Sequence, residues 1–154
     1  MAKNRNLKLK GIIFDVDGTL ADTEEVHRIA FNKTFLEFKL DWHWSEEKYI
    51  DLLSISGGKE RMMNFGSALR KEFETENEFQ VFISNMHRRK SQIYRQLLSD
   101  NKINLRPGVE RLINEAIDQN ISLNIATSSS LENINTLLKH NLGREWQKLF
   151  SVIE

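Results

Sequence analysis

The sequence contains no cysteine, which excludes disulfides, thiol catalysis and metal sites built from thiolates. It has a single proline, so few breaks are imposed on its helices. No apolar run approaches the roughly 18 residues that a membrane-spanning helix needs, and the short basic N-terminus lacks the apolar stretch of a signal peptide. We therefore expect a cytoplasmic protein that does not contact a membrane.

Charge of one sign is also lacking. The 22 basic and 22 acidic residues cancel to a formal net charge of zero, which argues against a nucleic-acid-binding protein that works through bulk positive charge. A length of 154 residues, with 40% hydrophobic and 29% charged residues, is ordinary for a compact globular domain. These values favour a small molecule over a nucleic acid as the partner.

Three short apolar segments predict strands. They are residues 10–16 (KGIIFDV), 121–126 (ISLNIA) and 150–153 (FSVI), and continuous runs of this kind are typical of strands buried on both faces of a parallel sheet. Apolar residues at helical spacing fill the rest of the chain, and Pro107 is placed to open a helix.

The order of these elements predicts the domain organisation. Only helical patterns occur over 22–100, between two pieces that carry strands. We expect an α/β fold in which residues 1–21 and 101–154 form a doubly wound, Rossmann-like core and residues 22–100 form an all-helical insert. Two strands and the start of a third would make a thin sheet.

The most informative stretch is Asp15-Val16-Asp17-Gly18, at the end of the first predicted strand. Side chains two residues apart on a strand share a side, and open α/β sheets bind ligands at such strand ends. Carboxylates this close raise one another's pKa unless a cation is present. The pattern predicts one carboxylate as nucleophile and Mg²⁺ ligand and the other as general acid/base. A plain turn is the alternative, while a calcium loop fails because it lacks a third acid and a closing glutamate.

Longer motifs carry a family resemblance. The segment GIIFDVDGTLADTEEVHRIAF (11–31) resembles the first motif of the haloacid dehalogenase-like superfamily of phosphohydrolases and phosphomutases. More narrowly, LDWHW (40–44), SGGKER (56–61), LRPGVERLI (105–113) and IATSSS (125–130) resemble the CbbY-like branch, which is related to β-phosphoglucomutase. That branch acts on sugar phosphates, with xylulose 1,5-bisphosphate as a known substrate.

The resemblance implies roles for individual residues. Asp15 resembles the nucleophile that forms an aspartyl-phosphate, and Asp17 the acid/base that protonates the leaving sugar oxygen and then activates water. The metal, Mg²⁺, would be held by Asp15 and by the backbone carbonyl of Asp17. Thr127 matches the hydroxyl that binds the transferring phosphoryl group, and Ser128 and Ser129 follow where backbone N–H groups at a helix start suit an anion.

The insert over 22–100 resembles the helical cap that closes over such sites. Glu24 and His27 fall at hinge and substrate-facing positions, although a lone helix histidine can equally be a solvated side chain. Lys59 and Arg61 are expected to clamp a second, non-reacting phosphate, the alternative being a solvated helix N-terminus. The run His87-Arg88-Arg89-Lys90 predicts a solvated helix face, and Trp42 and Trp44 are expected in the core.

The family pattern continues past the third strand to a lysine and an acidic motif, whereas this chain ends at Glu154. The resemblance therefore implies an incomplete core that lacks its C-terminal strands, and we expect the isolated chain to be poorly stable and nearly inactive. The predicted function is a Mg²⁺-dependent sugar-(bis)phosphate phosphatase, monomeric at full length. The alternatives are a β-phosphoglucomutase-like phosphomutase and a catalytically inactive module that binds a sugar phosphate.

Overall fold

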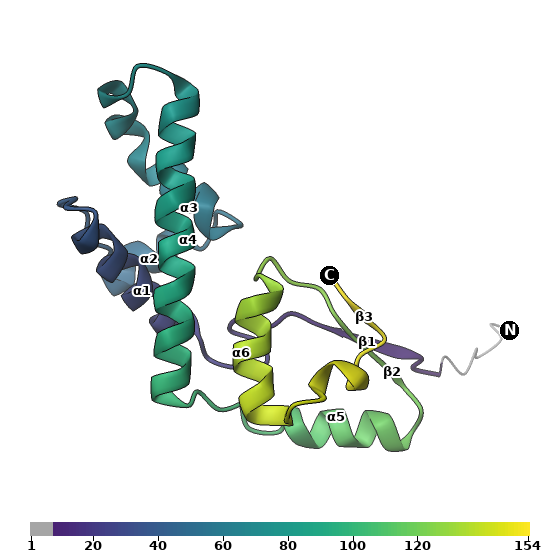
Figure 1. The fold of residues 1–154 in the computed structure, drawn as a ribbon. Helices are drawn as coiled ribbons and strands as arrows, with labels where there is room; N and C mark the ends of the chain where they lie inside the picture. The colour runs from purple at the N-terminus through teal and green to yellow at the C-terminus, as the bar shows by residue number, and fades with distance from the viewer. Residues whose placement is uncertain (1–7) are drawn as a thin grey trace, which may run out of the picture.

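The structure is a computed structural model that describes residues 8–154 (Figure 1). Its strands are β1 (Gly11–Phe14), β2 (Ser122–Ile125) and β3 (Val152–Ile153). Its α-helices are α1 (Glu24–Glu37), α2 (Glu46–Leu52), α3 (Gly58–Phe65), α4 (Glu76–Asn101), α5 (Val109–Asp118) and α6 (Leu131–Leu142). Two 3₁₀ helices, η1 (Gly66–Glu72) and η2 (Trp146–Leu149), complete the described chain. No helix in this part of the chain is both long and apolar enough to cross a membrane.

The three strands form a parallel sheet in the order β1-β2-β3, as the three apolar segments predict. Helices α5 and α6 pack on one side of the sheet, where Phe14 and its register partner Ile125 are buried. The prediction that the strands are buried on both faces is wrong for β1, because Ile13 points to the opposite face and is 71% exposed. The α/β architecture itself is as predicted.

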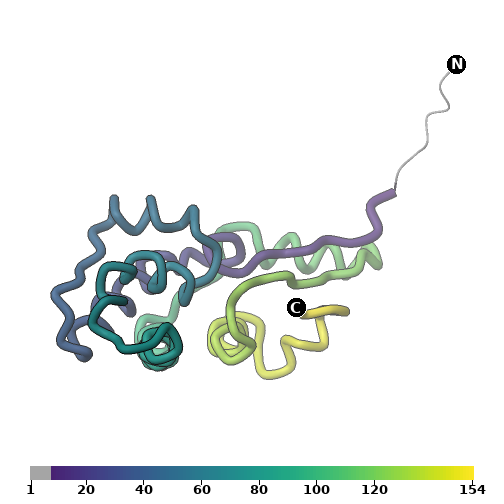
Figure 2. The backbone as a smooth tube through the Cα atoms, turned by 90° about the horizontal axis from the view of Figure 1, so that it is seen from above, coloured from purple at the N-terminus to yellow at the C-terminus, as the bar shows by residue number. Residues whose placement is uncertain are grey.

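Apolar side chains gather in two clusters rather than one. A sheet cluster joins β1 and β2 to α5 and α6, and a helical cluster joins the side chains of α1 to α4 (Figures 1 and 2). Helices α1 and α4 lie side by side and contribute to both clusters. In α4, Phe79 and Met86 belong to the helical cluster, and Ile93 and Leu98 to the sheet cluster. The change from one cluster to the other therefore occurs within these two helices.

Helix α4 begins and ends with well-defined local signals. The Thr75 side chain accepts a hydrogen bond from the backbone N–H of Glu78, and the Glu78 side chain accepts one from the backbone N–H of Thr75, which makes a capping box. At the other end Lys102 takes a left-handed conformation with φ of +46°. Between these signals the helix runs unbroken for 26 residues and reaches from the helical cluster to the sheet.

The run from His87 to Lys90 departs from the predicted solvated face. Arg88 is exposed and Arg89 is partly exposed and pairs with Glu37, but Lys90 is only 3% exposed and His87 is half-buried. Lys90 is buried because of its position along α4. It lies four residues after Met86, so the helical repeat places it on the buried stripe of this helix.

The helical cluster is built around aromatic rings. Trp44 is completely buried and contacts Phe31 and Phe35, with ring centroids 4.5 and 4.9 Å away, which agrees with the core position expected for it. Trp42 is half-buried and packs edge-on against Phe65, at 5.4 Å between centroids. Edge contacts of this kind add to the free energy gained from burying the rings.

Replacing Gly66 by alanine should destabilise the helical cluster, because an added Cβ would lie 2.3 Å from Cη2 of Trp42. The indole would have to move away from its aromatic neighbours, and overpacking of this kind typically costs about 1–3 kcal/mol. Urea denaturation of Gly66→Ala should show this loss in the free energy of unfolding. Ser67→Ala, at an exposed position of η1, is the matched control and should change it little; equal stability of the two variants would contradict the prediction.

Candidate active site

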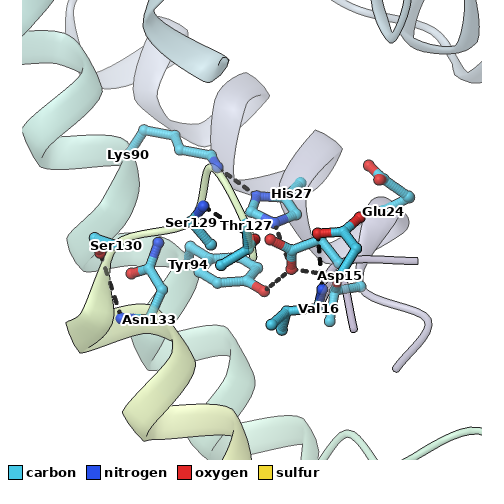
Figure 3. A network of polar contacts seen from close by, with 12 residues as sticks. Asp15, Val16, Glu24, His27, Lys90, Tyr94, Thr127, Ser129, Ser130 and Asn133 are labelled. Carbon is cyan, nitrogen blue, oxygen red and sulfur yellow. Dashed lines mark hydrogen bonds and ion pairs between the residues drawn. The ribbon is translucent and has the colours of Figure 1, made fainter. Parts of the chain in front are cut away.

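The carboxyl ends of β1 and β2 open into a cavity of about 410 Å³ that the helical segment covers. Loops after the two strands supply one wall, here called the sheet wall, and α1, α3 and α4 supply the other, here called the cap wall. Figure 3 shows side chains of both walls, among them Asp15, Thr127, His27 and Lys90. The polar residues that line the cavity include Asp15, Asp17, Glu24, His27, Arg61, His87, Lys90, Ser91, Thr127, Ser128, Ser129 and Asn133. Most of the predicted site residues are therefore brought together.

Asp15 is the first residue after β1, and its side chain is exposed to the cavity. Its Oδ1 atom accepts a hydrogen bond of 2.8 Å from the backbone N–H of Val16, which orients the carboxylate at the strand end. The chain then turns sharply, and Gly18 adopts a φ of +72° that favours glycine. An exposed, oriented carboxylate at this place is suited to nucleophilic attack.

Asp17 is held very differently, although it lies only two residues away. Its Oδ1 atom accepts hydrogen bonds from Thr23 Oγ1 at 2.7 Å and Tyr94 OH at 3.0 Å, and it faces His27 Nε2 at 3.0 Å. Burial raises the pKa of Asp17, but the hydrogen bonds from His27 and Thr23 outweigh it. The net result is a pKa well below the usual range, so Asp17 is ionised at neutral pH in this arrangement.

His27 connects Asp17 to a buried lysine. Its ring stacks on Tyr94, with centroids 3.9 Å apart and planes inclined by 11°, and its Nδ1 atom lies 2.5 Å from Lys90 Nζ. Because an ammonium group only donates, Nδ1 accepts here, and we assign the ring proton to Nε2, which donates to Asp17. Burial and the charge of Lys90 lower the pKa of His27, and burial lowers the pKa of Lys90 to about 7.

The loop after β2 faces the two carboxylates. Thr127 Oγ1 accepts a hydrogen bond of 3.2 Å from the Ser129 backbone, and Ser130 Oγ caps α6 by accepting from Asn133 N at 3.4 Å. Ser128, Ser129 and Asn133 all line the cavity at this helix N-terminus. Backbone N–H groups and the helix dipole make such a terminus favourable for a phosphate.

The cap wall brings Arg61 to the cavity but not Lys59. Arg61 donates from Nε to the Ile55 carbonyl at 2.9 Å, while Glu24 accepts from Tyr49 OH at 2.8 Å. Lys59 instead lines a separate surface hollow beside α3. The expected clamp of Lys59 and Arg61 is therefore not formed, because residues i and i+2 of a helix point to different sides.

Sequence reasoning missed Lys90 and Tyr94, which complete the surroundings of Asp17. The sequence does contain a pattern that indicates them. Lys90 interrupts an otherwise apolar stripe seven residues after Ile83, and Tyr94 follows it by one helical turn. A single basic residue on a buried stripe indicates a buried charge with a partner, since an unpaired buried ammonium is strongly unfavourable.

The donors at the end of β1 fit a magnesium ion. Asp15 offers an exposed carboxylate, and within residues 8–154 no backbone N–H donates to the carbonyl oxygen of Asp17, so that oxygen is free to bind a cation. The Asp17 carboxylate, by contrast, is turned toward α1 and α4. The described residues contain no group of three or more histidine, cysteine or acidic side chains that could enclose a metal. One or two protein oxygens with water and phosphate are what Mg²⁺ accepts.

A parallel sheet with paired aspartates after its first strand, beneath a helical cover, defines an α/β protein with an acidic site at the strand ends. The family model for haloacid dehalogenase-like hydrolases matches residues 12–154, and the chain belongs to this family. The predicted superfamily resemblance is thereby confirmed.

Two kinds of relative illustrate this membership. The plasmid-encoded protein CbbY of Cupriavidus necator is 40% identical over 94% of this chain and 57% of its own length. A crystal structure of mutant CbbY from Rhodobacter sphaeroides in complex with xylulose-(1,5)bisphosphate is 38% identical, with a TM-score of 0.79 over 95% of this chain and 63% of that one. A β-phosphoglucomutase from Clostridium difficile is 27% identical, with a TM-score of 0.67 over 95% of this chain and 61% of that one. The chain thus spans about 60% of the length of these relatives.

Substituting Lys90 by methionine should remove a pH dependence of stability. Burial lowers the pKa of Lys90 from 10.5 to about 7, so between these values the unfolded chain binds a proton that the folded chain does not. Stability must therefore rise with pH in this window, by about 2 kcal/mol between pH 7 and pH 9. Urea denaturation at both pH values should show the rise in the parent and not in Lys90→Met.

Arg89→Met is the matched control for this experiment, because Arg89 lies on the exposed side of the same helix and pairs only at the surface with Glu37. It should keep the full rise between pH 7 and pH 9. An identical rise in Lys90→Met would show that the ammonium group is not the source.

Proposed function

We propose that the protein containing this chain is a Mg²⁺-dependent phosphatase that hydrolyses a sugar bisphosphate such as xylulose 1,5-bisphosphate through an aspartyl-phosphate. The observation that carries the proposal is the contrast between two neighbouring aspartates in one cavity. Asp15 is exposed and oriented by one hydrogen bond, whereas Asp17 is half-buried and faces three donors. Two carboxylates with different surroundings suit two different roles, nucleophile and acid/base. The similarity to CbbY supports the choice of substrate.

In the first half of the reaction an Asp15 oxygen bonds to phosphorus and the bond from phosphorus to the sugar oxygen breaks. Asp17 gives its proton to that oxygen. A phosphate dianion bound near Asp17 raises the pKa of this carboxyl, which lets it carry the proton. In the second half Asp17 takes a proton from water, the water oxygen bonds to phosphorus, and the bond to Asp15 breaks to release phosphate.

Positioning and charge compensation are the main requirements of phosphoryl transfer. Thr127, Ser128 and Ser129 would hold the transferring phosphoryl group at the N-terminus of α6, beside Asp15. A magnesium ion, when bound by Asp15 and the Asp17 carbonyl, supplies positive charge at the phosphoryl oxygens. On the cap wall, Arg61 would take the second phosphate of the substrate.

Asp15→Asn should abolish phosphate release from xylulose 1,5-bisphosphate in the presence of Mg²⁺, by at least about a thousandfold, because the amide is a poor nucleophile. The measurement is free phosphate against time, with product analysis of the sugar. Asp22→Asn, at an exposed position near Arg106, is the matched control and should retain the parent rate.

The products decide between this function and the two alternatives. Isomerised sugar phosphate without net phosphate release would replace the phosphatase by a phosphomutase. Thermal stabilisation by the sugar bisphosphate that is unchanged in Asp15→Asn, with no phosphate released by the parent, would instead identify a binding module.

A further inference from the structure

Helix α4 presents His87, Lys90 and Ser91 to the cavity, and Tyr94 continues this side of the helix toward Asp17. Residues at this spacing lie above one another along one side of a helix. Tyr94 bonds to Asp17 and Lys90 bonds to His27, so both belong to the surroundings of the acid/base. His87 lies one turn further from Asp17, about 4.5 Å beyond Lys90 along the helix axis. It also lines the cavity, and within residues 8–154 its ring makes no hydrogen bond.

The position of the His87 ring is fixed by packing rather than by a polar partner. A Cβ atom added to Gly58, the first residue of α3, would lie 3.0 Å from His87 Nε2 and 3.1 Å from Phe31 Cζ. The imidazole therefore packs closely against the backbone of α3 at Gly58, where a larger residue would crowd it. A ring that is held in place and has unused polar atoms is prepared to bind a ligand without losing much side-chain entropy.

The ring is neutral at physiological pH. Burial lowers the pKa of His87 to about 4, the nearby charges of Lys90 and Lys59 lower it as well, and Glu60 only partly offsets them. A neutral imidazole offers one donor and one acceptor and forms no ion pair. Arg61, which lines the same wall of the cavity, carries a positive charge. His87 is thus suited to an oxygen atom of the sugar itself or to one oxygen of a phosphate already paired with Arg61.

We propose that His87 is a specificity-determining residue, whose ring hydrogen-bonds an oxygen of the substrate at the end remote from Asp15. This inference rests on the proposed function and adds to it a means of selection. A phosphorylated compound long enough to reach from Thr127 to the start of α3 gains the contact, and inorganic phosphate bound at Thr127 does not. His87 therefore favours extended sugar phosphates over short ones.

The test is a comparison of two probes in an Asp15→Asn background, which prevents turnover. Isothermal titration measures the Kd of xylulose 1,5-bisphosphate and of inorganic phosphate for this background and for the added His87→Phe change, which keeps a packed ring but removes its nitrogens. The Kd for the bisphosphate should rise about tenfold, the effect of one lost hydrogen bond with an unpaired partner, and that for inorganic phosphate should stay within about twofold. Adding His87→Gln instead should restore part of the affinity, because its amide can replace a ring nitrogen.

Arg88→Ala is the matched control, since Arg88 is the adjacent residue on the exposed side of α4 and bonds only to Asn85 among the described residues. It should leave both Kd values unchanged. Unchanged bisphosphate affinity in His87→Phe, or equal weakening of both probes, overturns the role of His87 and leaves the proposed function standing. A background protein that binds inorganic phosphate but binds the bisphosphate no more tightly also overturns it. Failure to bind either probe overturns the proposed function together with this inference.

Discussion

The structure depends above all on a single oxygen atom, Oδ1 of Asp17. It accepts from Thr23 and faces His27, both at the start of α1, and it accepts from Tyr94 in α4. Ionised carboxylates are costly to bury unless they are paired and fully hydrogen-bonded, so this oxygen requires its partners. The same requirement fixes the two long helices against the end of β1. The link between the sheet and the helical cluster is therefore polar at the place where the chemistry is proposed.

Lys90 extends this arrangement at the expense of stability. Its ammonium group is buried against the Phe31 ring, 4.4 Å from the centroid, and its hydrogen-bonding partner is the uncharged His27 rather than a carboxylate. An apolar residue would pack there at lower cost, because desolvation of a charge outweighs most of what its contacts return. A buried cation next to the His27–Asp17 pair does, however, set which nitrogen of His27 carries the proton. Groups of this kind are typical of functional sites, where stability is sacrificed for a defined protonation state.

The sequence predicts the parts of this site that lie close together along the chain. Asp15 and Asp17 follow a recognisable strand, and Thr127 to Ser129 follow another, so the geometry of parallel strands brings them together. Lys90 and Tyr94 could not be placed in this way, because they reach Asp17 only through the packing of α4 on α1, across 77 residues in the case of Tyr94. The charges in the run that precedes them resemble a solvated face, and only the stripe that contains Met86 distinguishes Lys90 from its neighbours. Lys59 was expected to face the cavity with Arg61, but the two residues are only two positions apart on α3. That separation turns Lys59 away from the cavity.

The two walls of the cavity differ in chemistry. This difference matches the proposed division between residues that react with the phosphoryl group and residues that select the substrate. The sheet wall holds the carboxylates and the helix N-terminus that a transferring phosphoryl group requires, with Asp17 fixed by direct partners. The cap wall holds Arg61, His87 and Ser91, none of which contacts Asp17, whereas His27 on the same wall does. A change at Arg61, His87 or Ser91 can therefore alter which molecule fits while the partners of Asp17 stay in place. Lys90 lies at the boundary, because it is the only described cavity residue on α4 that bonds to His27. Through it, the position of α4 and the protonation of His27 are coupled.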